Sequence, residues 1–138
     1  MDKARNYMAL ARKAGRIELG EEPVGAAARA QRARLVIVAS DASGHTLRRA
    51  QSFVSGTQQL CIRVPYSKDE LGEAIGRSSL AIAAFTDPAL ALAFVKALDP
   101  VKYKEQIDSL SVRTQRVQQR QAEARAHARN QKQGIKRK

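Results

Sequence analysis

The chain of 138 residues has a formal net charge of +12 and a pI of about 10.6. Its length fits one domain plus an extension, and a hydrophobic content of 43% with only 4% aromatic residues predicts an aliphatic core. Such a charge indicates a polyanionic partner, usually nucleic acid, although charge alone also fits a merely soluble basic surface. The most apolar region, residues 80–98, is interrupted by Thr86, Asp87 and Pro88 and carries Lys96, which argues against a membrane-spanning helix.

Cysteine use and the opening residues favour a cytoplasmic protein. Cys61 is the only cysteine, so no intrachain disulfide can form, as is usual in a reducing compartment. It lies in a mostly apolar run and is predicted to be a small buried core residue. The opening segment has neither an apolar stretch nor a small-residue cleavage site typical of a signal peptide. We therefore expect a cytoplasmic protein without a membrane partner.

The first predicted helix ends at Gly15 and is followed by a short strand at residues 16–19. Its apolar residues recur at helical spacing, which predicts an inward stripe of Tyr7, Leu10, Ala11 and Ala14.

The segment at residues 19–41 is predicted to form a tight glycine turn, a helix at about residues 23–32 and a buried strand at residues 34–39. Gly20 can adopt backbone angles that other residues avoid, and Pro23 suits the first turn of a helix. The uncapped N–H groups at such a helix start can hold a phosphate or a base edge. Glu21 and Glu22 at the same place favour the helix dipole, and as sequence neighbours they point in different directions, which argues against acid–base catalysis.

The second half of the domain continues the alternation of helix and strand. Ser43 or a neighbour is predicted to cap a helix with an apolar stripe, and strands follow at residues 60–64 and 80–85. Ser67 and Glu70 have the spacing of a capping box, and Asp87 with Pro88 starts a further helix. The predicted inward residues of these three helices are Leu47, Ala50, Phe53, Val54, Leu71, Ala74, Ile75, Leu90, Phe94, Val95 and Leu98.

This alternation predicts an α/β fold, a three-layer α/β/α sandwich with a small mixed sheet of about four strands. The domain is predicted to span residues 1–98, and a basic extension to span residues 99–138.

The extension begins at Asp99 and Pro100, a second N-cap pattern, and carries 11 basic and 3 acidic residues from Val101 onward. Tyr103, Ile107 and Leu110 fall on one helical face that can pack on the domain. After Val117 almost nothing apolar remains, so we expect a helical first part and a frayed or disordered end. The tail is either a solvated extension or an electrostatic arm that follows phosphates. Its candidate phosphate contacts are Arg113, Arg116, Arg120, Arg125 and Arg129.

No pattern in the chain indicates catalysis. His45 and His127 lie far apart, and neither metal-ligand spacing of Cys and His nor a phosphate-binding glycine motif occurs. We expect no catalytic residue, metal or cofactor.

Four segments of the chain resemble the ribosomal L-seven-Ae family of kink-turn RNA-binding proteins, and most closely its bacterial YlxQ branch. They are MALARKAGRIELGEE, the glycine turn with its helix and strand, SKDELGEAIG and LAIAAFTD. The resemblance covers about residues 3–98 and leaves the tail outside. Each motif is weak alone, and their shared order makes the resemblance specific.

The resemblance implies a non-catalytic α/β/α sandwich that binds RNA, often a kink-turn with sheared G·A pairs. In the family a Gly-x-Asn-Glu-x-x-Lys run at a helix start reads the guanines and their backbone. Here Gly20 matches the glycine, whereas Glu22, Pro23 and Ala26 stand at the Asn, Glu and Lys positions. Glu22 can accept hydrogen bonds from guanine but cannot donate one, so RNA binding is implied while kink-turn specificity is left open.

The family's loop over an extruded base corresponds to Gly76, Arg77, Ser78 and Ser79. Arg77 could stack on a base or pair with a phosphate, although the same residues also fit an ordinary polar turn.

Further candidate phosphate contacts are Lys13 and Arg16, which flank the first turn, and Arg29 on the recognition helix. All three equally fit solvated surface.

We therefore expect a monomeric RNA-binding protein of the ribosomal kind, with ribosomal or other structured RNA, or the ribosome itself, as its partner. One alternative is a protein–protein interaction module of the same fold, which the altered motif favours and the charge disfavours. The other is non-specific binding of DNA or RNA through the tail.

Overall fold

The computed structural model describes residues 2–136, with side chains described for residues 2–130. Every helix and strand expected from the sequence is present, with bounds shifted by a few residues. In chain order the elements are α1 (Lys3–Lys13), β1 (Ile17–Leu19), α2 (Glu21–Arg29), β2 (Leu35–Val38), α3 (Gly44–Val54), β3 (Leu60–Arg63), α4 (Lys68–Ala74), β4 (Ile82–Phe85), α5 (Pro88–Leu98) and α6 (Lys104–Lys136).

The four strands form one mixed sheet in the order β1-β4-β2-β3. β4 runs antiparallel to both β1 and β2, and β2 pairs parallel with β3. Strands β1, β2 and β3 therefore end at the same end of the sheet, where β1 leads into Gly20. We call this the glycine end. At the opposite end, here called the arginine end, Arg34 leads into β2 and its N–H donates to the Phe85 carbonyl at 2.8 Å.

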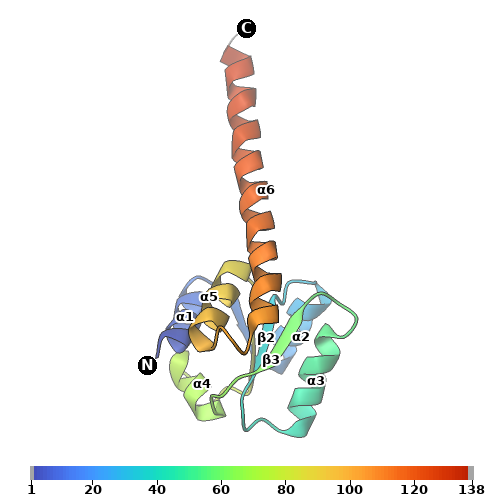
Figure 1. The fold of residues 1–138 in the computed structure, drawn as a ribbon, viewed down its shortest axis with the longest axis vertical. Coiled ribbons are helices and arrows are strands. Elements are labelled where there is room, and N and C mark those ends of the chain that lie inside the picture. Colours follow the sequence, from blue (N-terminus) through green and yellow to red (C-terminus); the bar gives the residue numbers. More distant parts are fainter. Residues whose placement is uncertain (1, 137–138) are drawn as a thin grey trace.

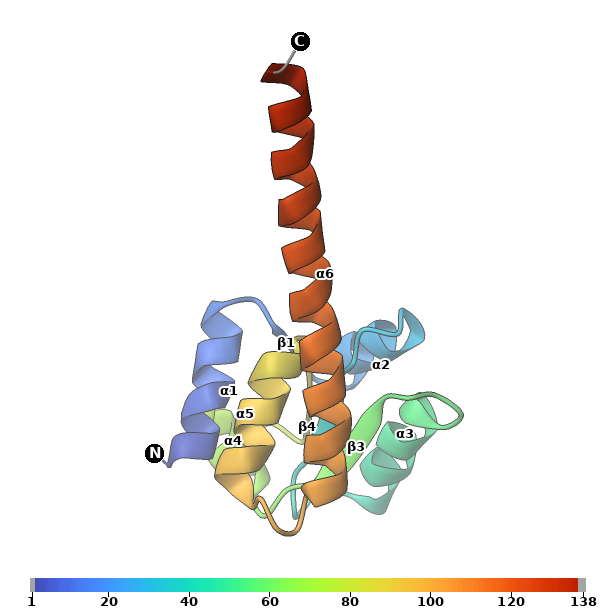
Figure 2. The same cartoon turned by 45° about the horizontal axis from the view of Figure 1, so that its top comes forward.

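Helices cover both faces of the sheet, which confirms the three-layer sandwich. Helices α2 and α3 lie on one face, and α1, α4, α5 and the start of α6 lie on the other (Figures 1 and 2). Side chains of β2 alternate between the layers, because successive residues of a strand point to opposite faces. Leu35 and Ile37 join the cluster under α1 and α5, and Val36 and Val38 join the cluster under α2 and α3.

The inward face of α1 differs from the stripe expected from the sequence. Ala4, Met8 and Ala11 are buried, whereas Leu10 is 50% exposed and Ala14 is also exposed. Both sets of residues have helical spacing, and they differ by a rotation about the helix axis. The structure buries Ala4 and Met8 in place of Leu10 and Ala14, and Ala11 belongs to both sets.

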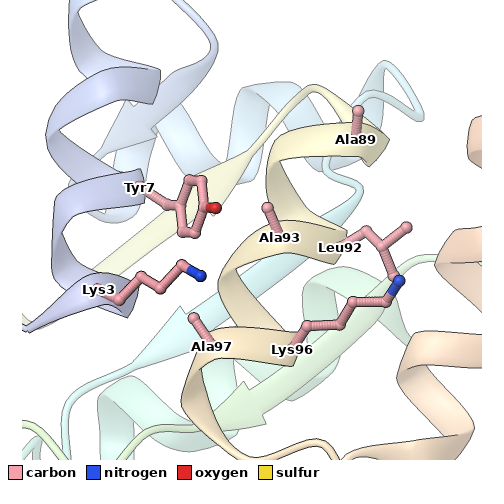
Figure 3. A pocket seen from close by; sticks show the side chains of 7 residues that line it. All are labelled: Lys3, Tyr7, Ala89, Leu92, Ala93, Lys96 and Ala97. Carbon is pink, nitrogen blue, oxygen red and sulfur yellow. The ribbon is translucent and has the colours of Figure 1, made fainter.

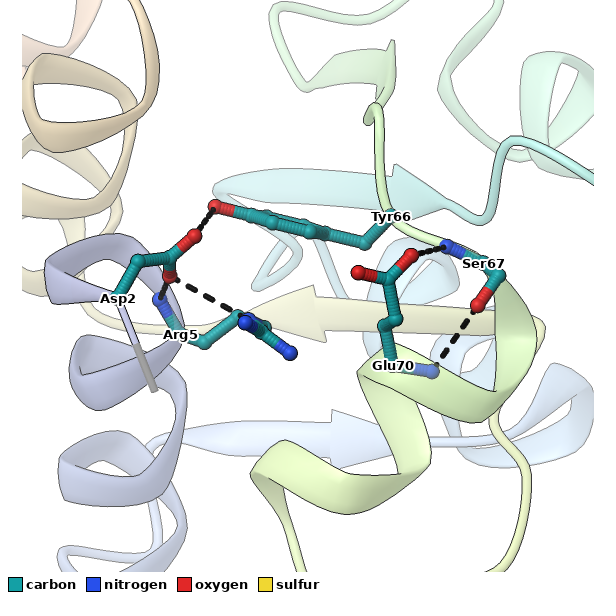
Figure 4. A network of polar contacts seen from close by, with 5 residues as sticks. All are labelled: Asp2, Arg5, Tyr66, Ser67 and Glu70. Carbon is teal, nitrogen blue, oxygen red and sulfur yellow. Dashed lines mark hydrogen bonds and ion pairs between the residues drawn. The ribbon is translucent and has the colours of Figure 1, made fainter.

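The expected caps are present at the helix starts. The Ser43 side chain accepts a hydrogen bond from the Thr46 N–H at 3.2 Å, and Asp87 accepts one from the Ala89 N–H at 3.2 Å. Ser67 and Glu70 complete the predicted capping box at the start of α4, as Figure 4 shows. These bonds satisfy backbone donors that have no partner inside the helix.

Asp2 ties the start of α1 to the segment before α4 (Figure 4). Its carboxylate caps α1 by accepting from the Arg5 N–H at 3.0 Å and accepts a second bond from the Tyr66 hydroxyl at 2.7 Å. Partial burial raises the pKa of this carboxyl, but the hydrogen bonds and the Arg5 charge outweigh burial, so the net pKa of Asp2 is lowered. The charged form is therefore favoured in the folded protein.

Helix α6 begins in the core and then leaves it. Tyr103 and Leu110 are buried with the residues under α5, and Ile107 packs against them, as the sequence predicted. Asp99 does not start α6 itself, because its side chain caps an intervening turn by accepting from the N–H groups of Val101 and Lys102. The extension thus shares its first turns with the main core.

The helix is longer than expected, since it continues to Lys136 rather than fraying after Val117. Its sequence is rich in Ala, Arg and Gln, which have favourable helix propensities. An i,i+4 hydrogen bond from Gln119 to Glu123 at 3.2 Å adds local support. The helix projects well beyond the sandwich (Figure 1). The basic side chains of Lys132, Lys136, Arg137 and Lys138 lie outside the described side chains.

Within residues 2–136, none of the helices combines the length and the apolar character that crossing a membrane requires.

Candidate nucleic-acid interface

Gly20 forms the turn between β1 and α2 with φ 95° and ψ 163°. A positive φ of this size is costly for residues with a Cβ, which is why glycine is required here. The Gly20 N–H donates to the Ile82 carbonyl at 3.0 Å, and the Gly20 carbonyl accepts from the Val24 N–H at 3.1 Å. No side chain caps α2. The first N–H groups of α2 therefore have no capping side chain, as expected for a helix that starts at a glycine.

Glu21 in this first turn forms an ion pair with Arg49 of α3. The Arg49 Nε and the Glu21 Oε1 are 2.6 Å apart. The same carboxylate oxygen is buried without a hydrogen-bond partner, so the contact is a close charge pair rather than a well-directed hydrogen bond. The Arg49 guanidinium also lies 5.3 Å from the centre of the Phe53 ring. Sequence reasoning missed Arg49, because no spacing along the chain links α3 to the start of α2.

A hollow of about 560 Å³ runs along α2 beside this ion pair. Glu21, Glu22 and Arg29, three candidate residues from the sequence, line it together with Arg49. Arg29 belongs to the last turn of α2, and its guanidinium folds back toward Gly25. A Cβ at Gly25 would lie 3.0 Å from the Phe53 ring, so this glycine lets α3 pack closely.

The loop of Gly76, Arg77, Ser78 and Ser79 lies at the same end of the sheet. Ser79 is three residues before Ile82, whose carbonyl binds the Gly20 N–H, and three residues span at most about 10 Å. The Arg77 N–H donates to the Gly72 carbonyl at 2.8 Å, and a Cβ on Gly72 would lie 2.7 Å from the Ser79 nitrogen. The loop is thus packed directly on α4, while its three residues after Gly76 remain exposed. Gly72 was not identified from the sequence.

Lys13 and Arg16 do not join this site. The Arg16 carbonyl accepts from the Thr86 N–H at 2.9 Å, which places Arg16 at the arginine end. The extended chain from Arg16 to Gly20 covers about 13 Å at about 3.3 Å per residue. Both residues flank the turn at Gly15, and β1 carries the chain from there across the sheet to Gly20.

The tail arginines divide into two groups. Arg113, Arg116 and Arg120 line a second hollow at the arginine end together with Arg34. Arg125 and Arg129 are exposed farther along α6. At 100° per residue they point about 120–160° away from Arg113 around the helix. The structure therefore brings together only three of the five predicted tail contacts.

A third hollow, of about 320 Å³, lies between α1 and α5 in the layer opposite α2. Lys3 and Tyr7 point into it over a floor of alanines, and Lys96 extends along α5 beside Leu92 (Figure 3). None of the predicted site residues lines it.

Among the described residues, no three or more His, Cys, Asp and Glu side chains gather as a metal site. Cys61 is only partly buried, contrary to the sequence expectation, because β3 is an edge strand of the sheet. Burial nevertheless raises the pKa of its thiol to about 11. The thiol is therefore protonated and unreactive near neutral pH.

These features define a class of protein: an α/β/α sandwich with open, charged surfaces at the two ends of a small sheet. The sequence model of the ribosomal protein L7Ae/L30e/S12e/Gadd45 family matches residues 2–93. The chain belongs to this family, as its four sequence segments suggested.

Many solved structures resemble the chain, among them the following two, whereas no curated protein matches it significantly. One is a Bacillus halodurans protein of unknown function, with a TM-score of 0.67 and 26% identity over 72% of this chain and 99% of that chain. The other is a Giardia lamblia 15.5kD RNA binding protein, with a TM-score of 0.60 and 18% identity over 78% of this chain and 87% of that chain. The second likeness is one of fold.

Proposed function

We propose that the protein binds structured RNA without catalysing a reaction, and that the glycine end of the sheet is the reading surface. The observation that carries this proposal is the uncapped start of α2 behind Gly20, at the same end as the exposed loop of Arg77 to Ser79. The family membership and the likeness to an RNA-binding protein support it. The formal charge of +12 favours a polyanion over a protein partner.

The chemistry at the glycine end suits a base edge beside a phosphate. Backbone N–H groups at the start of α2 donate to RNA oxygens, and the helix dipole strengthens them. The Glu22 carboxylate accepts from guanine N1–H and N2–H₂. Arg77 stacks on an unpaired base or binds a phosphate. The face of α2 that reads RNA is thus positioned by a turn that only glycine adopts easily.

Arg29 and Arg49 supply positive charge where the family's Lys position is occupied by Ala26. Both guanidiniums line the hollow along α2. Glu21 already holds Arg49 within ion-pair distance, so part of this charge is neutralised inside the protein. We infer that this surface binds a kink-turn less tightly than a site with Asn and Lys, and that kink-turn RNA is one member of a broader class of targets.

We also propose the branch of the family, the oligomeric state, the cellular compartment and the class of RNA target. The four sequence segments favour the bacterial YlxQ branch, and we propose a monomeric, cytoplasmic protein that acts on ribosomal or other structured RNA. Residues beyond the sandwich add affinity that does not depend on base sequence, through α6 and the release of counterions.

Binding of matched probes across a salt series tests the proposal. The probes are a kink-turn hairpin RNA, a plain duplex RNA and a duplex DNA of equal length. We expect the kink-turn hairpin to bind more tightly than the duplexes at every salt concentration, because only the hairpin exposes sheared guanines. No measurable binding to any probe would favour a protein–protein module, and equal binding to all three would favour a non-specific nucleic-acid binder.

A substitution at the reading surface sharpens this test. Glu22→Asn restores a donor next to guanine and removes a negative charge, and it is expected to tighten kink-turn binding by about 1 kcal/mol, or about fivefold. Glu105→Asn removes the same charge from an exposed position at the start of α6 and serves as the matched control. An equal effect of the two variants would show that the start of α2 does not read the RNA.

A further inference from the structure

Arg34 occupies an unusual place at the arginine end. It is held by its own N–H bond to Phe85 and by the neighbouring loop, which Gln59 fixes. The Gln59 Oε1 accepts from the Ala33 N–H at 2.9 Å, and its Nε2 donates to the Ala28 carbonyl at 3.1 Å. The Arg34 Nε is buried and has no hydrogen-bond acceptor among the described residues. A buried donor on a cation without an acceptor is costly, which points to a ligand as its partner.

Three arginines of α6 face Arg34 across a hollow of about 250 Å³. Arg113, Arg116 and Arg120 follow a spacing of three and four residues, so they lie on one face of the helix. Docking of Leu110 in the core aims this face at the arginine end. We call the hollow with these four arginines the arginine pocket. Its remaining lining residues are Gln31, Gln58, Gln59 and Val117.

The arginine pocket has positive charge without compensation. Its lining contains no carboxylate, and among the described residues none of its four arginines has a salt bridge. Burial, followed by the nearby charges of Arg34 and Arg116, lowers the pKa of Arg113. Asp87 lies at the same end of the sheet, but its side chain caps α5. The guanidiniums therefore repel one another in the free protein, and an anion relieves that repulsion.

A neighbouring hollow of about 440 Å³ extends the arginine pocket toward β3. The two share Gln58, Gln59, Arg113 and Arg116, and the second adds Thr57 and Ser109 among its lining residues. Together they form a groove between α6 and the turn before β3, rather than a closed cavity for one small ion. A groove with charged donors in one wall suits a chain of phosphates.

We propose that the arginine pocket is a second RNA contact, which holds a backbone phosphate at the opposite end of the sheet from Gly20. Guanidiniums bind phosphate oxygens through paired N–H donors, and this pocket directs several of them into one space. The contact is independent of base identity. This inference rests on the proposed RNA-binding function and adds to it a fixed phosphate site in place of a diffuse basic arm.

The experiment compares two pairs of substitutions that remove equal charge from α6 and its surroundings. Arg34→Gln with Arg113→Gln removes two positive charges from the arginine pocket. Arg125→Gln with Arg129→Gln removes two positive charges from another face of α6. The probe is a plain duplex RNA of about 20 base pairs, titrated between about 50 and 200 mM salt. We expect the pocket pair to weaken binding at least about tenfold and to reduce the log–log salt slope by about 0.7–0.9, the value for the one phosphate that the protein no longer neutralises.

The pair Arg125→Gln and Arg129→Gln is expected to weaken binding less than about threefold, as generic screening of charge predicts. Arg48→Gln with Lys96→Gln, two exposed residues that do not line the arginine pocket, is expected to behave in the same way. Equal losses for the pocket pair and the α6 pair would overturn the pocket and leave a diffuse arm, with RNA binding itself intact. Loss of kink-turn binding on substitution at Arg77, with duplex binding retained, would support the pocket as a contact separate from the reading surface.

A stability measurement separates binding from a structural role. Because the four guanidiniums repel one another, the pocket pair is expected to melt at the same temperature as the unchanged protein or higher. Inorganic phosphate is expected to raise the melting temperature of the unchanged protein more than that of the pocket pair, by mass action on the folded state. A lower melting temperature for the pocket pair, with no difference in the response to phosphate, would overturn the proposal. Stabilisation by phosphate without binding of duplex RNA would overturn the assignment to RNA.

Discussion

The two ends of the sheet present different chemistry to a nucleic acid. At the glycine end the hollow along α2 combines backbone donors with two carboxylates, Glu21 and Glu22, that offset the charges of Arg29 and Arg49. At the arginine end four guanidiniums line one hollow without a carboxylate. Local charge balance lets shape and hydrogen bonding decide what binds, whereas uncompensated charge attracts any phosphate backbone. Selectivity and affinity are thus expected to reside at opposite ends of one small sheet.

The largest effect is expected from removing the anchor of α6. Leu110 is fully buried, so Leu110→Ala should cost about 2–5 kcal/mol of unfolding free energy and release the face that carries Arg113. Urea unfolding measures the loss, and titration with duplex RNA should show weaker binding. Val112→Ala, at a residue that is 47% exposed, is the control and should stay within about 0.5 kcal/mol. Similar costs for the two variants would mean that α6 is not docked through Leu110.

The loop at the glycine end can be disrupted separately by a substitution at Gly72. A Cβ there would lie 2.7 Å from the Ser79 nitrogen and 2.8 Å from the Arg77 carbonyl oxygen. Gly72→Ala should therefore cost about 1–3 kcal/mol and displace the loop that carries Arg77. Binding of the kink-turn hairpin should weaken while the salt slope with duplex RNA stays unchanged. Glu73→Ala on the same helix is exposed and serves as the control. A retained kink-turn affinity would remove the loop from the reading surface.

A smaller effect, which depends on pH, is expected for the hydrogen bonds of Asp2. Asp2→Ala removes the cap of α1 and the acceptor of the Tyr66 hydroxyl, at a cost of about 1 kcal/mol. Because folding lowers the pKa of Asp2, its charge stabilises the protein fully above the ordinary pKa of about 3.8 and loses this effect as pH falls through the lowered value. Asp2→Asn keeps a capping residue and isolates the charge. Thermal melts from neutral to acidic pH should show that the variant's lower stability approaches that of the unchanged protein at low pH. A stability difference that does not depend on pH would show that the Asp2 charge does not stabilise the fold.

The smallest change in stability is expected from shortening α6. Truncation after Arg120 keeps the arginine pocket and removes residues 121–138, whose described side chains are nearly all exposed. The unfolding free energy should change by no more than about 0.5 kcal/mol. The affinity for duplex RNA should fall less than in the pair Arg34→Gln and Arg113→Gln. A greater fall on truncation would show that the main phosphate contact lies on the projecting part of α6 rather than at the arginine end.

Local patterns along the chain predicted most elements correctly, because caps and apolar spacing act within a few residues. The capping box of Ser67 and Glu70, the cap at Asp87 and the docking of Tyr103 and Leu110 were all predicted in this way. The inward face of α1 was not, since the helical spacing of Leu10 and Ala14 is as regular as that of Ala4 and Met8. The length of α6 was also underestimated, because a polar helix without a docking surface gives no apolar signal beyond Val117.

The sequence by itself determined the fold family, the glycine turn and the excess of positive charge, because each depends on residue type and local order. Only the tertiary structure decided which charges meet. β1 carries Arg16 away from Gly20, α3 brings Arg49 to Glu21, and the docking of α6 places Arg113 opposite Arg34. These pairs are distant along the chain, and packing of helices on the two faces of the sheet brings them together.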